Sequence, residues 1–298
     1  PLLTISITDP NTVTGTTDPD AGGGAIFNNG HLVLLGSSII GNTSSNHGGG
    51  LHNIASLIDP PTLGQQVIIA NSTFANNTAV VNGGAIYQDN ADDVLQLVNL
   101  TIANNSAANG GGIYNEGDGE SPDVSPFDDV SIVNTILDSN GPNNCAGGTI
   151  GNGNLIASGN NVVFGGACDI RQQDPSSTIA SPITADPDLG LEELTFSIPS
   201  IITIAFPLGT NSSAHGNGDA TLCLNFPVIN LDQRALPRPQ GATLCDIGAY
   251  ESSSPAPQPE MNVQGNSVTI ADGEIIISLG DHTQFVATTV GTAVSRTY

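Results

Sequence analysis

The sequence is short of positive charge. Its 298 residues include no lysine and only four arginines against 28 acidic residues, which gives a formal charge of −24. Proteins that bind nucleic acid or anionic membranes need a basic surface to neutralise phosphates. The composition therefore excludes both as partners, and the lack of lysine excludes lysine-based catalysis. The arginines are Arg171, Arg234, Arg238 and Arg296.

Large apolar side chains and long apolar runs are also scarce. The chain has no tryptophan, one methionine and 4% aromatic residues, and no apolar run is long enough for a membrane-spanning helix. We therefore expect no membrane span in this chain. With few strong helix formers and no sustained helical period, a helical fold is disfavoured.

A short pattern does recur four times between residues 22 and 140. Its first half places a Gly-Gly pair before an aliphatic residue, and its second half ends in asparagine. The first halves are residues 23–28, 49–53, 83–88 and 111–115, and the second halves are 38–42, 73–77, 101–105 and 136–140. The final asparagines are 35, 28 and 35 residues apart. A period in this range indicates a repeat architecture.

The repeat unit consists of short strands. Residues 67–69, 94–97 and 130–133 are short, β-branched runs bounded by Gly, Asn and Asp. Glycine pairs suit the turns of a coil, and asparagine tolerates left-handed backbone and can hydrogen-bond to the next asparagine of a stack. The sequence therefore predicts an all-β fold, a parallel β-helix in which equivalent positions of successive coils stack.

The stacking predicts three rows of residues. The turn ladder is Asn42, Asn77, Asn105 and Asn140. One interior row is Ile26, Leu51, Ile86 and Ile113, and the other is Ile39, Phe74, Ile102 and Leu137.

The alternation of Gly-Gly-Ala-Ile with Phe-x-x-Asn resembles the repeats of polymorphic outer-membrane and autotransporter-type passenger proteins. This resemblance implies a right-handed parallel β-helix that is exported to a bacterial cell surface. The motif is short, and its fourfold recurrence at matching offsets is what makes it specific.

Four cysteines fall into two pairs with similar spacing, Cys145 with Cys168 and Cys223 with Cys245. Neither pair has the spacing of a metal site, so they indicate disulfides in an oxidising, extracellular setting. Four cysteines allow three connectivities, of which we expect the two local bonds. Each closes a loop worth about 3 kcal/mol in the loop-entropy model.

An acidic insertion lengthens one step of the repeat between residues 116 and 129. Carboxylates on a glycine-rich loop suit Ca²⁺, and a solvated acidic loop is the alternative, which we favour because EF-hand spacing is absent. If a structural calcium binds, its ligands come from Glu116, Asp118, Glu120, Asp128 and Asp129. We expect no other cofactor.

Six asparagines head an Asn-x-Ser/Thr sequon for N-glycosylation, and such triplets also arise by composition in a turn-rich chain. They are Asn42, Asn71, Asn76, Asn99, Asn104 and Asn211.

The chain contains no grouping typical of an enzyme. The five histidines form no metal-ligand pattern, and His47 and His52, five residues apart around a glycine turn, are interpreted as a chance polar pair. No Ser–His–Asp group is identifiable. Although many polysaccharide lyases and hydrolases are β-helices, fold alone does not imply activity. We therefore predict no enzymatic function.

Beyond Cys145 the regular repeat fades, and a distinctive motif closes the segment. It joins residues 232–239, Asp-Gln-Arg-Ala-Leu-Pro-Arg-Pro, to residues 245–251, Cys-Asp-Ile-Gly-Ala-Tyr-Glu. This motif resembles the end of the choice-of-anchor Q domain, a β-helical module of secreted bacterial surface proteins. We interpret the motif as an ion-paired lock that fastens the last coil. Arg234 and Arg238 are expected to pair with Asp232, Asp246 or Glu251; a catalytic arginine beside an aspartate is the less favoured alternative.

We expect a β-helix over residues 1–251, with regular coils at 21–144 and irregular closing coils at 145–251. A proline-rich linker follows at 252–259. Residues 260–298 contain strand-like runs that resemble the start of a choice-of-anchor D, immunoglobulin-like module. A complete sandwich takes about 100 residues.

The favoured hypothesis is an extracellular structural protein of a bacterial surface, a stalk or filament subunit. If the termini are those of the mature protein, the C-terminal strands are expected to pair with an exposed strand edge of the next copy, head to tail. The alternative is that a longer parent chain completes the immunoglobulin-like module. A second hypothesis is an adhesin that binds glycans or another cell surface, and a polysaccharide lyase or hydrolase is the least favoured.

Overall fold

The computed structural model describes residues 22–54, 67–89, 95–117, 130–147, 160–168, 182–190, 202–238 and 244–252. It also describes the strand residues 6–7, 12–13, 155–157, 170–172, 192–195, 264–265 and 268–269. The chain divides into two units, Pro1–Ser254 and Pro255–Tyr298. In the second unit the described elements are β23 (Gln264–Gly265) and β24 (Val268–Thr269), an antiparallel pair. The expected immunoglobulin-like strands after residue 269 lie outside the described residues.

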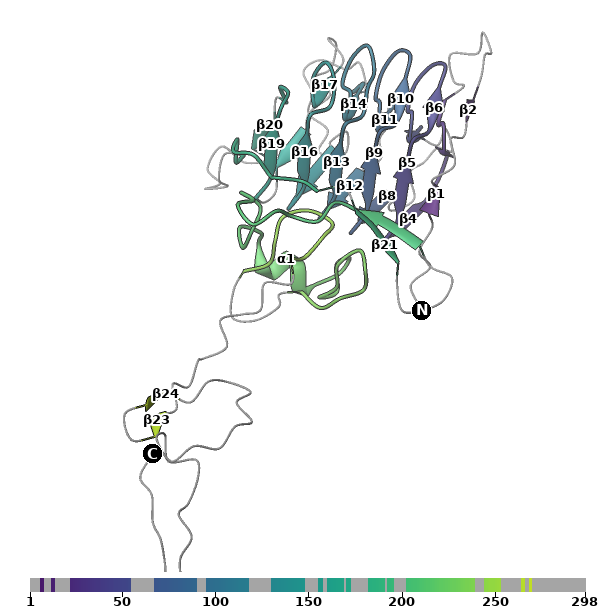
Figure 1. Cartoon of the computed structure of the whole chain (residues 1–298). Coiled ribbons are helices and arrows are strands. Elements are labelled where there is room, and N and C mark those ends of the chain that lie inside the picture. The colour runs from purple at the N-terminus through teal and green to yellow at the C-terminus, as the bar shows by residue number, and fades with distance from the viewer. Residues whose placement is uncertain are drawn as a thin grey trace, which may run out of the picture. The chain divides into compact units, whose positions relative to one another are not determined.

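The first unit is a parallel β-helix, as predicted (Figure 1). Each coil runs through three parallel sheets in turn, here called sheets 1, 2 and 3. Sheet 1 contains β3 (Ile26–Asn28), β7 (Leu51–Asn53), β11 (Ile86–Gln88), β14 (Ile113–Asn115) and β17 (Cys145–Gly147). Sheet 2 contains β4 (Leu32–Leu35), β8 (Val67–Ala70), β12 (Leu95–Val98), β15 (Val130–Val133), β18 (Leu155–Ala157) and β20 (Ile170–Gln172).

Sheet 3 contains β1 (Ser6–Ile7), β5 (Ser38–Ile40), β9 (Thr73–Ala75), β13 (Thr101–Ala103), β16 (Ile136–Asp138) and β19 (Val162–Phe164). A small fourth sheet lies between sheet 3 and the next coil. It contains β2 (Thr12–Val13), β6 (Thr43–Ser44) and β10 (Thr78–Ala79).

The two predicted interior rows are confirmed in register. In sheet 1, Ile86 pairs with Leu51 on one side and Ile113 on the other, and in sheet 3, Ile102 pairs with Phe74 and Leu137. These six side chains are fully buried. Together with the inward residues of sheet 2 they form one continuous apolar core.

Glycine is required at the turn that returns the chain to sheet 1. Gly83 has φ of 66°, which L side chains rarely adopt. At Gly84, a Cβ would lie 2.3 Å from the carbonyl oxygen of Gly111 in the next coil. The Gly-Gly motif therefore combines a left-handed backbone with the closest approach between coils.

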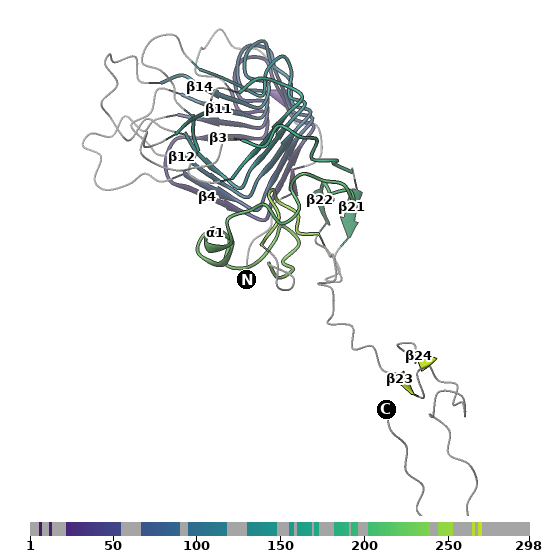
Figure 2. The same cartoon turned by 90° about the vertical axis from the view of Figure 1, so that its left-hand side faces the viewer.

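The segment after residue 182 corrects the prediction of closing coils over 145–251. The strands β17, β18, β19 and β20 stack on earlier strands, but residues 202–238 and 244–252, together called the closing segment below, return along the outer face of sheet 3. The segment contains β22 (Ile202–Ala205), which pairs antiparallel with β21 (Glu192–Thr195), and the helix α1 (Ala220–Leu224). Figure 2 shows β21, β22 and α1 outside the coils.

The closing segment is packed against sheet 3 by apolar and polar contacts. Phe206 packs on the outward residues Ala75 and Ala103, and Ala214 and Ile247 pack on Ile136 and Val162. The outer face of sheet 3 is therefore a second, smaller core.

Candidate functional site

Five buried asparagine amides form a continuous hydrogen-bonded ladder. Each Nδ2 donates to the Oδ1 of the next coil, at 2.9 Å from Asn42 to Asn77, 2.9 Å from Asn77 to Asn105 and 2.8 Å from Asn105 to Asn140. The backbone N–H of each donor residue donates to the same oxygen, at 3.0, 2.9 and 2.9 Å. The predicted turn ladder is thus present as a chain of paired bonds along the coil axis.

The ladder ends on a residue that the sequence repeat does not predict. Asn140 donates to Oδ1 of Asn144, at 2.8 Å, and Asn144 donates to the carbonyl oxygens of Phe164 and Gly166. The last amide therefore binds main chain, and no donor of the ladder's end is left unpaired.

A second asparagine row holds the closing segment. Asn71, Asn99 and Asn134 have φ between 47° and 52° at the turn from sheet 2 to sheet 3. Asn71 donates to the carbonyl oxygen of Leu231 at 2.8 Å, and Asn134 accepts from the N–H of Asp219 at 2.8 Å. The sequence carried a signal for this row, since its spacing of 28 and 35 residues repeats that of the turn ladder.

Asp232 and Arg234 form the first half of the predicted lock. Nη2 of Arg234 lies 2.6 Å from Oδ2 of Asp232, and the guanidinium lies 3.6 Å from the ring centre of Tyr250. The Asp232 carboxylate also accepts the backbone N–H groups of Arg234, Leu236 and Glu251. One buried carboxylate therefore ties two distant parts of the closing motif together.

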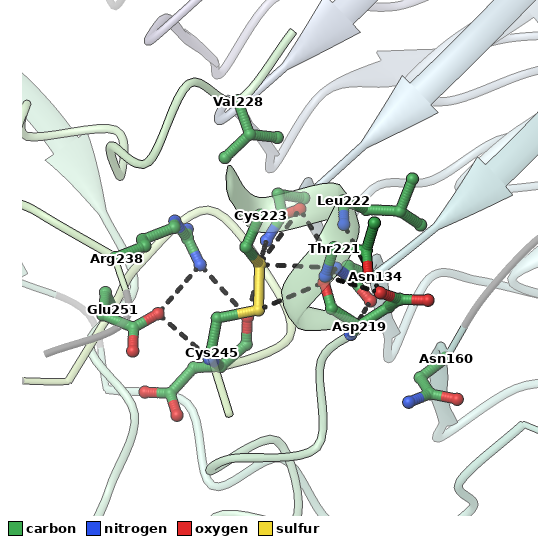
Figure 3. The surroundings of a disulfide bond; sticks show 12 residues. Asn134, Asn160, Asp219, Thr221, Leu222, Cys223, Val228, Arg238, Cys245 and Glu251 are labelled. Carbon is green, nitrogen blue, oxygen red and sulfur yellow. Dashed lines mark hydrogen bonds and ion pairs between the residues drawn. A yellow bond between two sulfur atoms is a disulfide. The ribbon is translucent and has the colours of Figure 1, made fainter. Parts of the chain in front are cut away.

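Arg238 and Glu251 form the second half, which Figure 3 shows beside a disulfide. The Arg238 side chain is fully buried, and its Nη1 lies 3.1 Å from Oε2 of Glu251. It also donates to the carbonyl oxygens of Leu231, Asp246 and Gly248. Because these carbonyls and the carboxylate satisfy the guanidinium, the charge is tolerated inside the protein.

The electrostatics of this pair are set by burial. Burial raises the pKa of Glu251 to about 7; Asp246 and Asp232 act in the same direction, whereas Arg238 opposes the shift. Burial also lowers the pKa of Arg238, and its three acidic neighbours oppose that change. The lock therefore couples one guanidinium to a carboxyl group that titrates near neutrality.

Asp246 was expected among the acids that pair with the two arginines, but the arginines pair with Asp232 and Glu251 instead. Its carboxylate lies 3.5 Å from Nδ1 of His215 rather than against an arginine. It accepts the N–H of Gly216 at 2.7 Å and of Ser252 at 2.8 Å. Asp246 reaches Arg238 only through its main-chain carbonyl, because backbone N–H groups occupy the carboxylate.

The closing motif fastens several coils and not the last one alone, since Ile247 packs on Val162 while its other contacts lie on earlier coils. Beside it, Gln233 accepts from the hydroxyl of Thr73 at 2.6 Å and donates to Ser38 at 2.8 Å. The N–H of Ala249 donates to the hydroxyl of Thr101 at 3.1 Å. The closing segment therefore bridges successive coils, from Ser38 to Val162, on their outer side.

Both expected disulfides are present. Cys145 and Cys168 join β17 to the segment that follows β19, with Cα atoms 4.5 Å apart. Cys223 of α1 joins Cys245 of the closing motif, with Cα atoms 6.6 Å apart (Figure 3). The described residues contain no free cysteine.

Aromatic and imidazole rings line the outer face of sheet 1. This aromatic row consists of Phe27, His52, Tyr87 and Tyr114, with paired ring centres 4.8 to 5.7 Å apart. His47 stacks on Tyr87 at 4.3 Å. Phe27 is 48% exposed, whereas His52 and Tyr87 are buried. This row was not predicted, although its members occupy one position of the Gly-Gly motif in the sequence.

Two histidines, His47 and His52, lie close together on this face. His47 and His52 have ring centres 6.1 Å apart, and Nε2 of His52 lies 4.0 Å from Oδ2 of Asp89. Burial lowers the pKa of His47, and His52 acts in the same direction. Within the described part of the chain, no three His, Cys, Asp or Glu side chains gather as a metal site.

One residue of the predicted calcium set is described. Glu116 accepts a hydrogen bond from the hydroxyl of Tyr87, and burial raises the pKa of its carboxyl group. The other four, Asp118, Glu120, Asp128 and Asp129, lie outside the described residues, so calcium binding stays a prediction.

Comparison with known proteins supports the repeat. Residues 71–89 and 99–116 match the family model described as a Chlamydia polymorphic membrane protein repeat. No curated protein and no solved structure matches the chain. The matched residues contain β9, β11, β13 and β14, and they carry the ladder residues Asn77 and Asn105. The chain is thus similar to Chlamydia polymorphic membrane protein repeats over two of its coils.

Among the described residues, no helix is long and apolar enough to cross a membrane.

Proposed function

We propose that this chain is an extracellular structural protein of a bacterial surface, whose β-helix serves as a rigid stalk. The observation that carries the proposal is the continuous asparagine ladder, in which three amide-to-amide bonds join successive coils along the axis and a fourth, from Asn140 to Asn144, ends the row. Such stacking fixes the register of every coil to the next, so the rod resists bending and local opening.

The closing segment and the disulfides support the same role. The segment bridges Ser38, Thr73 and Thr101 from outside the coils, and each disulfide closes a loop in an exported, oxidising environment. The acidic composition and the match to a polymorphic membrane protein repeat fit an extracellular location.

A non-enzymatic role is part of the proposal. The carboxylates of Asp232, Asp246 and Glu251 are each engaged by backbone N–H groups. Groups held in this way stabilise the fold. We also propose that the stalk needs no cofactor.

The finer part of the proposal is head-to-tail assembly of copies. Among the described strands, β20 pairs with β18 alone, and a strand edge of this kind is a template for another strand. In this proposal the C-terminal strands of one copy pair with the strand edge of the next. Because this contact is heterologous, it generates an open filament.

Electron microscopy of the purified chain tests the assembly. We expect fibres many times longer than one molecule, and we expect deletion of residues 260–298 to abolish them while circular dichroism still reports the folded β-helix. Fibres that persist without the tail, or isolated short particles at every concentration, contradict the proposal.

A second candidate function is adhesion, and the aromatic row favours it. Rings on an outer sheet face can stack on the apolar faces of sugars, and Phe27 is the most exposed ring of the row. Glycan-array binding that is lost in Phe27→Ala but kept in Val80→Ala supports adhesion, since Val80 is an exposed apolar residue after β10. Equal binding by both variants would assign recognition to another surface.

A further inference from the structure

The fold divides the six Asn-x-Ser/Thr sequons into three classes. A sequon can accept a glycan only where its asparagine amide and its hydroxyl, two residues on, are both free to meet a transferase. The hydrogen bonds of each sequon therefore show which sites the folded protein leaves open.

In three sequons both groups hold the fold together. Asn71 donates to Leu231, and the hydroxyl of Thr73 donates to Gln233. Asn99 donates to the carbonyl oxygens of Asp246 and Gly248, and the hydroxyl of Thr101 accepts from Ala249.

The third closed sequon belongs to the turn ladder. Asn42 donates to Asn77, and the hydroxyl of Ser44 accepts the N–H of Asn46. The side chains of Asn42, Asn71 and Asn99 are at most 5% exposed. A glycan on any of them breaks the ladder or separates the closing segment from the coils.

In the sequon of Asn211 only the asparagine is free. Its side chain is exposed, but the hydroxyl of Ser213 donates to the carbonyl oxygen of Ala185 at 2.9 Å. This sequon therefore lacks a free hydroxyl in the folded chain.

In the remaining two sequons both groups face solvent. Asn76 and Asn104 are exposed, as are the hydroxyl residues Thr78 and Ser106. In the described part of the chain, neither the side-chain amide of Asn76 nor that of Asn104 makes a hydrogen bond. Both asparagines have left-handed backbone, with φ of 54° and 57°, at the same turn of adjacent coils.

We propose that Asn76 and Asn104 are N-glycosylation sites and that the four other sequons stay unmodified. The donor is a sugar activated as a diphosphate. Nδ2 forms a bond to the anomeric carbon, the bond from that carbon to the diphosphate oxygen breaks with its electron pair leaving on that oxygen, and the amide proton passes to a base of the transferase.

The two acceptors are close together. Ala75 and Ala103, which precede them, are paired in adjacent parallel strands, and such strands lie about 4.8 Å apart. A bulky glycan on one asparagine therefore hinders the transferase at the other. We expect molecules with one glycan to outnumber molecules with two.

Glycopeptide mass spectrometry of the protein from the cells that produce it tests the proposal. Enzymatic release of the glycans in ¹⁸O-water converts each occupied asparagine to a labelled aspartate. We expect label at Asn76 and Asn104 only. Absence of label at both, or label at Asn42, Asn71, Asn99 or Asn211, overturns the proposal.

Variants of the two hydroxyl residues test whether glycosylation can be lost without a loss of stability. Thr78→Val and Ser106→Ala each remove an exposed hydroxyl, so each is expected to abolish label at its own asparagine with an unchanged melting temperature. The double variant is expected to carry no glycan. Label that persists at Asn76 in Thr78→Val contradicts the assignment, whereas Thr78→Ser keeps the sequon and is the matched control.

Discussion

Replacing Asn105 removes the centre of the asparagine ladder. Its Oδ1 accepts two bonds from Asn77, through the backbone N–H and through Nδ2, both at 2.9 Å. Its Nδ2 donates to Oδ1 of Asn140 and to the carbonyl oxygens of Phe74 and Ala103, at 2.8 to 3.1 Å. Asn105→Ala removes all five bonds from a side chain that is 1% exposed.

The expected loss follows from the groups left behind. The backbone N–H of Asn77 loses its acceptor, and a buried unsatisfied donor costs about 1–3 kcal/mol. Nδ2 of Asn77 keeps the carbonyl of Ile39, and Oδ1 of Asn140 keeps the backbone N–H of Asn105. Adding about 1 kcal/mol for each lost amide pair, we expect Asn105→Ala to lower the free energy of unfolding by about 3–5 kcal/mol.

Asn105→Asp distinguishes hydrogen bonding from packing. An ionised aspartate has almost the same volume but places an oxygen where Nδ2 stood, facing the oxygens of Phe74, Ala103 and Asn140. We therefore expect Asn105→Asp to be more destabilising than Asn105→Ala at pH 7, and to recover part of the loss as the aspartate is protonated at lower pH.

Urea unfolding followed by circular dichroism measures these differences. The control is Asn109→Ala, because Asn109 makes the same kind of amide bond to Asn82, at 2.9 Å, on an exposed surface. It is expected to change stability by less than about 0.5 kcal/mol. The ladder argument fails if Asn105→Ala matches this control, or if Asn105→Asp is the milder of the two Asn105 variants.

Three further outcomes are expected. Ile86→Asp, which buries an unpaired charge in the interior row, should prevent folding, and a melting temperature equal to that of the wild type would refute the register. The pKa of Glu251 is raised to about 7 in the folded protein, so its contribution to stability is fully present below pH 4.5 and declines by about 2–3 kcal/mol as the pH rises to 7. The difference between wild type and Glu251→Gln in unfolding free energy against pH should show this decline, and a flat difference would contradict it. Replacing both Cys223 and Cys245 by alanine should cost about 2–4 kcal/mol in urea unfolding, and a loss below about 0.5 kcal/mol would mean that the closing segment is held without the bond.

The coils could be predicted from the sequence because their contacts are periodic. Equivalent residues such as Asn77 and Asn105 occupy the same position of the repeat, so the spacing alone predicts that they stack. Ile86 and Ile102 were placed in the correct rows for the same reason. In a parallel β-helix the neighbour of a residue is its equivalent one coil away, and the sequence records that relation directly.

The closing segment could not be predicted in the same way. Gln233 contacts Ser38 and Thr73, which are 195 and 160 residues distant, and no period relates them. The distinctive motif revealed that Arg234 and Arg238 pair with nearby acids, but not which coils they fasten. The docking surface is formed by outward-facing side chains of sheet 3, whose pattern resembles that of any solvated strand face.

Immunogold electron microscopy of intact cells that produce this protein tests the central claim most directly. With antibodies against the folded Pro1–Ser254 unit, the account predicts gold on the outer surface of unpermeabilised cells, arranged along thin extended structures. Label that requires permeabilisation of the cells would contradict an extracellular stalk, and label scattered evenly over the envelope would contradict the filament.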